Sequence, residues 1–277
     1  MHQEHPGTYV SPTSYIVPAI IGSSVPCIPI VHDLIAFLDE PHERRARWIE
    51  RLTLGRAVKH AAHICTLSDA TTKDLRERFP ALSPERVTTI GAGPRRAEVA
   101  MNTPDNATIL CVGTLCPRKN QERLIQAYAR LPDALRRTYG LVLAGGHGWQ
   151  DDGILRLARS TPGVLWANYV TDAEYERLLG SCTIFVLPSL YEGFGLTVLD
   201  ALQRGTPVLT SDRGSLREVA GDAAVTVDPE SIASIAEGLE RLLRDSALRL
   251  SLRERGPAQA RLFSWKKTAE KFILLSC

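Results

Sequence analysis

The 277-residue sequence has no cysteine pattern typical of a metal site or a disulfide framework. Its six cysteines include no C-x-x-C pair and follow no regular spacing. Several lie in or beside apolar runs such as "HICTL" and "TILCVG", where cysteine packs as a small apolar side chain. The sequence also begins without the pattern of a signal peptide. We therefore expect a reduced, cytoplasmic setting.

Long apolar runs are missing as well. The most apolar stretch covers residues 15–38, but several prolines, a glycine and Asp33 interrupt it. A membrane-spanning helix needs roughly 20 consecutive apolar residues, which this stretch does not supply. The basic residues of an expected helix at 44–59 spread around its axis, which is untypical of an interfacial helix. We expect a soluble protein, with peripheral contact at the inner face of the cell membrane as the alternative.

Neither sign of charge dominates. Lys and Arg number 33 against 31 Asp and Glu, which gives a net charge of +2. The residues before Ala107 carry 12 basic and 12 acidic side chains, and those after it carry 21 and 19. A duplex-binding surface uses an excess of positive charge to release counterions. The balance found here argues against nucleic acid as the main partner.

The sequence does contain short β-branched runs that alternate with amphipathic stretches, which is typical of α/β units on a parallel sheet. We expect strands at 27–31, 63–67, 86–90, 108–113, 140–146, 164–168, 183–188 and 207–210. We expect helices at 43–62, 69–79, 120–131, 151–160, 172–181, 195–204, 230–244 and 264–275. The helix after Thr171 opens with "TDAE" (171–174), in which Thr171 and Glu174 can form a capping box.

These elements predict two domains. Residues 1–95 form the first α/β domain, and residues 96–107 have the composition of a linker. Residues 108–262 form the second α/β domain, and 263–277 form a C-terminal helix that packs back on the first. The cleft between two such domains is the expected ligand site.

The densest functional signal is "PSLYEGFGLTVLDALQRGTPV" at 188–208. A strand ends there, and Gly193-Phe194-Gly195 leads into a helix whose first amides can bind an anion. Glu192 and Asp200 lie eight positions apart in this segment. Each acid taken alone is more simply explained as a turn residue or a solvated helix residue. Together with the glycines they favour a binding site.

Five segments resemble, in this order, the donor half of family 4 retaining glycosyltransferases. They are "VGTLCPRKN" (112–120), "LAGGHGW" (143–149), "NYVTDAEYERLL" (168–179), "VLPSLYEGFGLTVLDA" (186–201) and "SLREVAGDAAVTVDP" (215–229). "VHD" (31–33) and "TLSDATTKDL" (66–75) resemble the later part of that family's acceptor domain. The resemblance implies a GT-B fold, with two Rossmann-like parallel-sheet domains facing a cleft. It also implies transfer of a sugar from a nucleotide donor with retention of configuration.

The resemblance gives Arg118 and Lys119 the role of gripping the donor diphosphate. A guanidinium fork and a mobile ammonium can together neutralise two phosphates and stabilise the leaving nucleotide. The alternative is that the pair lies on a solvated loop, although Pro117 and the preceding strand fix that loop. On this reading no metal and no cofactor is needed, because the nucleotide-diphosphate sugar is itself the donor substrate.

The same resemblance implies that Glu192 binds hydroxyls of the transferred sugar. It implies that Gly193, Phe194 and Gly195 present backbone amides to the sugar and phosphate. Asp200 takes the place of the second acid, which binds the ribose. Because Asp is one methylene shorter than the family's Glu, we expect weaker or water-mediated ribose contact.

The remaining expected site residues are spread over both domains. The loops at Gly113 and Gly146 would pass close to the donor, and the backbone at Tyr169 and Val170 would bind the base. His32 would donate a hydrogen bond near the sugar and diphosphate. The alternative for His32 is a buried histidine capped by Asp33 or by a carbonyl group.

The resemblance also implies that the first domain is shortened, because several βα units should precede the segment that matches "VHD".

Three functions are compatible with this shortened first domain. The first is a working hexosyltransferase that uses a GDP- or UDP-linked sugar and a glycan or lipid-linked acceptor, with a membrane-bound acceptor or a partner chain completing the acceptor side. The second is a weak or inactive nucleotide-sugar binding module. The third, a nucleotide-dependent oxidoreductase, fits worst because no strand leads into G-x-G-x-x-G. Front-face transfer, in which the departing phosphate takes the acceptor's proton, is what the resemblance implies for the first.

Overall fold

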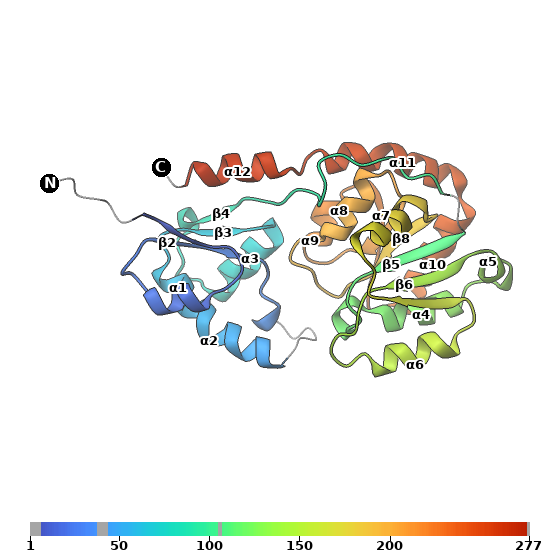
Figure 1. The fold of residues 1–277 in the computed structure, drawn as a ribbon, viewed down its shortest axis with the longest axis horizontal. Helices are drawn as coiled ribbons and strands as arrows, with labels where there is room; N and C mark the ends of the chain where they lie inside the picture. The colour runs from blue at the N-terminus through green and yellow to red at the C-terminus, as the bar shows by residue number, and fades with distance from the viewer. Residues whose placement is uncertain (1–6, 38–43, 105–106, 276–277) are drawn as a thin grey trace. The chain divides into compact units, whose positions relative to one another are not determined.

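The computed structural model describes residues 7–37, 44–104 and 107–275. The chain is divided into two compact units (Figure 1). One consists of Met1–Gly93 together with Ser264–Cys277, and the other of Pro94–Phe263. None of the helices in these described ranges is long and apolar enough to cross a bilayer. Each unit is considered by itself below.

The first unit is built on a parallel sheet with the strand order β1-β2-β3-β4. Its strands are β1 (Tyr9–Ser11), β2 (Cys27–Val31), β3 (Ile64–Thr66) and β4 (Val87–Thr89). Its helices are α1 (Ile16–Ile21), α2 (Arg44–His60), α3 (Asp69–Arg78) and α12 (Trp265–Ile273), with 3-10 turns η1 (Ile35–Phe37) and η2 (Pro84–Arg86). Phe272 and Leu275, in and just after α12, pack against Ile28, Cys65 and Ile90 of this unit.

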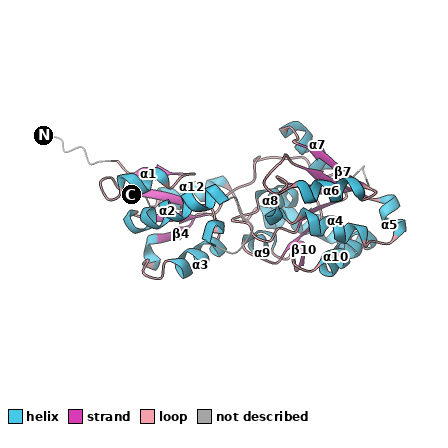
Figure 2. Ribbon diagram, turned by 90° about the horizontal axis from the view of Figure 1, so that it is seen from below, coloured by secondary structure: helices cyan, strands magenta, loops and turns pink. Residues whose placement is uncertain are grey.

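The second unit holds a larger parallel sheet with the order β10-β9-β8-β5-β6-β7. Its two edge strands, β7 and β10, are labelled in Figure 2. Its strands are β5 (Thr108–Val112), β6 (Gly140–Ala144), β7 (Val164–Asn168), β8 (Ile184–Leu187), β9 (Val208–Ser211) and β10 (Ala224–Val227). Its α-helices are α4 (Gln121–Ala129), α5 (Asp133–Thr138), α6 (Asp152–Ser160), α7 (Asp172–Ser181), α8 (Leu196–Gln203), α9 (Ser215–Ala220), α10 (Ile232–Arg244) and α11 (Ser246–Ala260). A 3-10 turn, η3, covers Pro117–Lys119. The expected α/β class with two parallel-sheet, Rossmann-like units is confirmed.

In the sheet of the second unit, the direction in which successive strands are added reverses at β5. This first strand pairs with β6 on one side and with β8 on the other, so the chain winds outward both ways. In parallel α/β sheets the crevice outside the carboxyl ends of the strands at such a switch point is where ligands bind. The loops that follow β5 and β8 therefore meet at the place where a ligand is expected.

Four elements of the second unit lie outside the expected helices and strands. Strand β10 is a half-exposed edge strand of only four residues, so its apolar run is too short to stand out. Helices α5 and α9 have six residues each, too few to show a period. Helix α11 contains Pro257 and several exposed apolar positions, which blurs its amphipathic pattern.

The segment from Pro94 to Pro104 has neither helix nor strand, but it is tied to the second unit. Asn102 is buried, and its side-chain amide donates to the carbonyls of Leu179 and Cys182 at 2.9 and 3.0 Å. Gln203 donates to the carbonyls of Arg96 and Ala97. Residues 94–104, which include most of the segment with linker composition, thus form a strap along this unit.

Candidate active site

Two cations and one carboxylate meet at the switch point of the second unit. Arg118 and Lys119 lie on η3, directly after β5, and Glu192 lies on the loop after β8. Nη1 of Arg118 is 2.9 Å from one oxygen of Glu192, and Nζ of Lys119 is 2.5 Å from the other. Their side chains are only 18%, 15% and 11% exposed, so this ion cluster is largely shielded from water. The structure brings these three expected residues together.

Asn120 fixes the position of the two cations. It adopts the left-handed conformation with φ = 63°, which asparagine tolerates better than most residues. Its buried side-chain amide donates to the carbonyls of Pro188 and Pro229 at 2.9 and 2.7 Å. Sequence reasoning did not assign a role to Asn120. The sequence feature that could have indicated it is an asparagine placed between the basic residues Arg118 and Lys119 and the start of a helix.

Glu192 is held in its ionised form. Burial by itself would raise the pKa of this carboxyl group, but the charges of Lys119 and Arg118 and the hydrogen bonds from Lys119 and Ser189 outweigh it. The pKa of Glu192 falls to about 2. The Ser189 hydroxyl donates to it at 2.7 Å. At neutral pH the cluster therefore carries one negative and two positive charges, a net attraction for an anion.

The Gly193-Phe194-Gly195 loop is shaped by packing on both sides. Gly195 has φ = 99°, and a Cβ there would lie 2.7 Å from the side chain of Leu216. The Phe194 side chain is buried and meets Phe263 edge to face at 5.7 Å between ring centroids. The Ser215 hydroxyl donates to the carbonyl of Glu192 at 2.8 Å. Helix α8 then begins at Leu196, so its first amides face the carboxyl edge of the sheet.

Glycines bring the loops after β5 and β6 into contact. A Cβ at Gly145 would lie 2.0 Å from the carbonyl oxygen of Gly113, and one at Gly148 would lie 2.2 Å from that of Leu115. Neither position has space for any side chain. The expected residue Gly146 is less crowded, since a Cβ there would meet only Tyr169, at 3.8 Å. The close approach therefore depends on the two glycines that flank it.

The loops after β6 and β7 flank the ion cluster's loops at the carboxyl edge of the sheet. Tyr169 is 76% exposed and Val170 is half-buried. The ring of His147 stands edge to face on Trp166 at 4.8 Å, and its Nδ1 lies 2.8 Å from a carboxylate oxygen of Asp151. Sequence reasoning found no role for His147. The i, i+4 spacing of a histidine and an aspartate was the available signal.

Asp200 is occupied by internal partners. It is buried, and its two oxygens accept from the backbone N–H of Arg95 at 2.9 Å and from the Tyr175 hydroxyl at 2.8 Å. Burial, only partly offset by these hydrogen bonds and the Arg95 charge, raises the pKa of this carboxyl group. In the structure Asp200 joins α8 to the strap and to α7. A ribose hydroxyl would have to share these oxygens.

Replacing Tyr175 by phenylalanine is expected to lower the free energy of unfolding by about 1–3 kcal/mol, because one oxygen of a buried carboxylate loses its donor. Chemical denaturation of the wild-type and Tyr175→Phe proteins measures this loss. Tyr139→Phe is the control, because that hydroxyl has no hydrogen bond within the described residues. Equal stabilities of the wild type and Tyr175→Phe would show that the Asp200–Tyr175 bond contributes nothing.

His32 belongs to the first unit, directly after β2. It is exposed, and its Nε2 lies 2.5 Å from the carbonyl oxygen of Pro12, so the ring nitrogen donates. The Thr71 hydroxyl donates to the backbone carbonyl of His32. Asp33 does not cap the histidine ring, because its carboxylate accepts from the N–H of Ile35.

Solved structures share the architecture of this chain. Sucrose-phosphate synthase from Thermosynechococcus elongatus superposes with a TM-score of 0.79 at 21% identity, over 96% of this chain and 72% of that one. HepE of Anabaena, solved in complex with UDP and glucose, gives 0.77 at 18% identity over 94% and 74%. At this level of identity the likeness shows the fold alone. That fold is the GT-B architecture of glycosyltransferases.

The sequence comparisons identify the family. The model of the glycosyl transferases group 1 family matches residues 97–259. The O-antigen chain mannosyltransferase B of Escherichia coli is 34% identical over an aligned length of 258 residues, and the match covers 87% of this chain and 68% of that protein. The chain therefore belongs to the group 1 glycosyl transferases.

Proposed function

We propose that this glycosyltransferase moves a hexose from a nucleotide-diphosphate sugar to a glycan or lipid-linked saccharide, with retention of configuration, in the synthesis of a cell-surface polysaccharide. The observation that carries the proposal is the shielded cluster of Arg118, Lys119 and Glu192 at the switch point. The similarity to an O-antigen mannosyltransferase supports the polysaccharide role and favours mannose as the sugar. GDP- and UDP-linked donors are the candidates for the nucleotide.

Each residue of the cluster has a definite part in the proposed reaction. Arg118 and Lys119 neutralise the diphosphate as the bond between the anomeric carbon and its phosphate oxygen breaks. Glu192 accepts hydrogen bonds from sugar hydroxyls and keeps both cations in place. The acceptor oxygen forms the new bond on the same face of the sugar, and its proton goes to the departing phosphate. These side chains supply the positive charge that a metal supplies elsewhere.

The flanking groups are proposed to bind the rest of the donor. The loops at Gly113 and Gly146 would lie against the diphosphate and sugar, and the backbone at Tyr169 and Val170 would bind the base. Asp200 would reach the ribose through water, because its own oxygens already have partners. For His32 to donate a hydrogen bond to the transferred sugar, its Nε2 would exchange the carbonyl oxygen of Pro12 for a sugar hydroxyl.

Thermal unfolding with UDP, GDP, ADP and their sugar conjugates is expected to single out one base. A nucleotide at about 100 times its dissociation constant adds about 2.7 kcal/mol to the free energy of unfolding. For a chain of this size the midpoint would rise by roughly 5–10 °C. No rise with any nucleotide in a cooperatively folded sample would contradict the proposed donor site.

A transfer assay separates the proposal from its alternative, a nucleotide-sugar binding module that does not transfer. The nucleotide that stabilises the protein identifies the sugar donor to use, and proton NMR of the product reports the anomeric configuration. An acceptor-dependent product with the configuration of the donor supports the retaining transferase. Binding without turnover over a panel of glycan and lipid-linked acceptors supports the binding module.

A further inference from the structure

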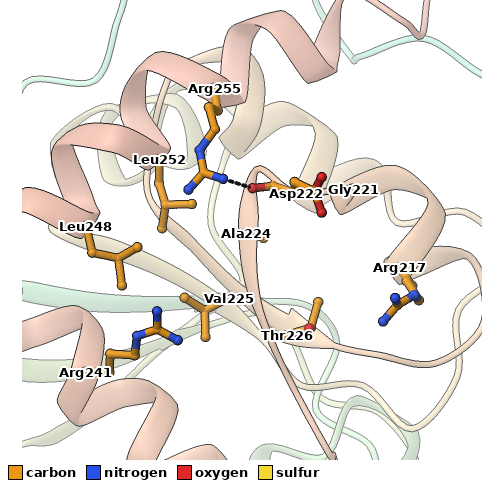
Figure 3. A pocket seen from close by; sticks show the side chains of 10 residues that line it. All are labelled: Arg217, Gly221, Asp222, Ala224, Val225, Thr226, Arg241, Leu248, Leu252 and Arg255. Carbon is orange, nitrogen blue, oxygen red and sulfur yellow. Dashed lines mark hydrogen bonds between the residues drawn. The ribbon is translucent and has the colours of Figure 1, made fainter.

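A pocket lies on the second unit, and Arg118, Lys119 and Glu192 are not among the described residues that line it. Figure 3 shows its lining side chains. Its volume is about 490 Å³, within the range of small-ligand sites. Strand β10, the end of α9 and the helices α10 and α11 surround it. Because β10 is the edge strand, β9 and β8 separate it from β5, which precedes the ion cluster. The pocket is therefore distinct from the proposed donor site.

The charges around this pocket are one-sided. Arg217, Arg241 and Arg255 line it, and Asp222 is the single carboxylate among its described lining residues. In the part of the chain that the structure describes, the guanidinium groups of Arg217 and Arg241 make no hydrogen bond or ion pair. Arg255 uses one N–H to donate to the backbone carbonyl of Asp222 at 2.6 Å. Figure 3 shows Arg241 and Arg255 reaching towards β10 from opposite sides. The net charge of this wall favours an anion.

The other residues that line the pocket suit a polar ligand that has one apolar face. Val225, Leu248 and Leu252 supply apolar contacts. Among the strands that the structure describes, β10 pairs with β9 on one side only, so the backbone groups of its other edge face outward. Unpaired strand N–H and C=O groups can bind hydroxyl groups, and the Thr226 and Asp222 side chains add further polar atoms. This combination of apolar surface and hydrogen-bonding groups matches a sugar ring.

We propose that this pocket binds a sugar phosphate, with the phosphate between Arg241 and Arg255 and the sugar ring along the edge of β10. A guanidinium fork fits phosphate oxygens in a bidentate way, which makes arginine the better match than lysine. Arg217, at the other end of the pocket, contacts the ligand from beyond Thr226. This site takes a ligand in addition to the nucleotide sugar and does not depend on the proposed transfer reaction.

Isothermal titration with glucose 1-phosphate, inorganic phosphate and glucose tests the proposal. Phosphate at the ion cluster is excluded by titrating the Arg118→Ala protein beside the wild type. We expect glucose 1-phosphate to bind both proteins, and the Arg241→Ala/Arg255→Ala change to weaken this binding on the order of tenfold for each arginine. Arg244→Ala, on the same helix and paired with Glu240, is the matched control and should bind as the wild type does.

Each further outcome decides the question. The Arg241→Lys/Arg255→Lys protein keeps the charge but loses the fork, so intermediate affinity supports the proposal even if the alanine variant unfolds. No binding to the wild type, or equal affinity in the lysine or folded alanine variant, overturns it. Inorganic phosphate binding as tightly as glucose 1-phosphate would show an anion site without a sugar site. Because no nucleotide is used, failure of the proposed donor site leaves this result unaffected.

Discussion

Glu192→Gln is expected to lower the rate of sugar transfer by about 10²–10³-fold. Glutamine keeps the shape of the side chain but removes the charge that Arg118 and Lys119 share. The free energy of unfolding should fall by about 3 kcal/mol, because two shielded cations lose their carboxylate partner. Steady-state kinetics and chemical denaturation of the same preparations measure both effects.

A matched control separates the loss of this ion cluster from the loss of any acid nearby. Glu122→Gln changes an exposed acid on the first turn of α4, close in sequence to Lys119. It should leave rate and stability near those of the wild type. A Glu192→Gln protein with wild-type transfer would remove Glu192 from the proposed reaction.

The pH dependence of stability gives an independent readout of Glu192. Its pKa is about 2 in the folded protein and 4.5 in the reference state. A group whose pKa is lower in the folded state stabilises the fold above the unfolded value, and this stabilisation disappears as pH falls towards 2. The difference corresponds to about 3 kcal/mol. The wild type should lose this part of its stability between pH 5 and pH 2, and Glu192→Gln should lack it. If the free energies of unfolding of the wild type and of Glu192→Gln changed in parallel over this range, the low pKa of Glu192 would be contradicted.

The sequence was sufficient for much of the fold because the main elements have strong local signals. The buried strands β5 and β8 read as continuous apolar runs. The helix expected at 172–181 appears over those residues with the predicted capping box, in which the Thr171 hydroxyl accepts from the N–H of Glu174 and the Glu174 carboxylate accepts from that of Thr171. Periodicity and capping are properties of neighbouring residues, so they can be read before any tertiary contact is known.

The partners of the site residues could not be predicted in the same way. The hydrogen bond from the N–H of Arg95 to Asp200 joins positions 105 residues apart, and Asn120 bonds to Pro229 across 109. Such pairs form only when separate βα units pack side by side. For this reason the motif could suggest Asp200 as a ribose ligand, but it could not show that both carboxylate oxygens already have donors.

The choice of arginine at 118 has a consequence for nucleotide affinity. Its Nη1 lies 2.9 Å from both the Glu192 carboxylate and the carbonyl oxygen of Tyr191, which orient the guanidinium plane before any ligand binds. An oriented fork loses little rotational freedom when it grips a diphosphate. Arg118→Ala is therefore expected to weaken nucleoside diphosphate binding by about 2–4 kcal/mol, or roughly 30- to 1000-fold.

The diphosphate itself provides the test of this role. A nucleoside without phosphates should bind the wild type and Arg118→Ala equally, because the base and ribose do not contact the fork in the proposed site. Arg118→Lys keeps the charge and should bind the diphosphate with intermediate affinity, since an ammonium cannot form the bidentate pair. Arg130→Ala, an exposed change at the end of α4, is the control.

If Arg118→Ala weakened nucleoside and nucleoside diphosphate equally, Arg118 would be holding the loop after β8 through Tyr191 and Glu192 rather than gripping phosphate. Because Lys119 and Ser189 still bind Glu192 in this variant, the loop should stay in place, and the loss should fall on the diphosphate alone.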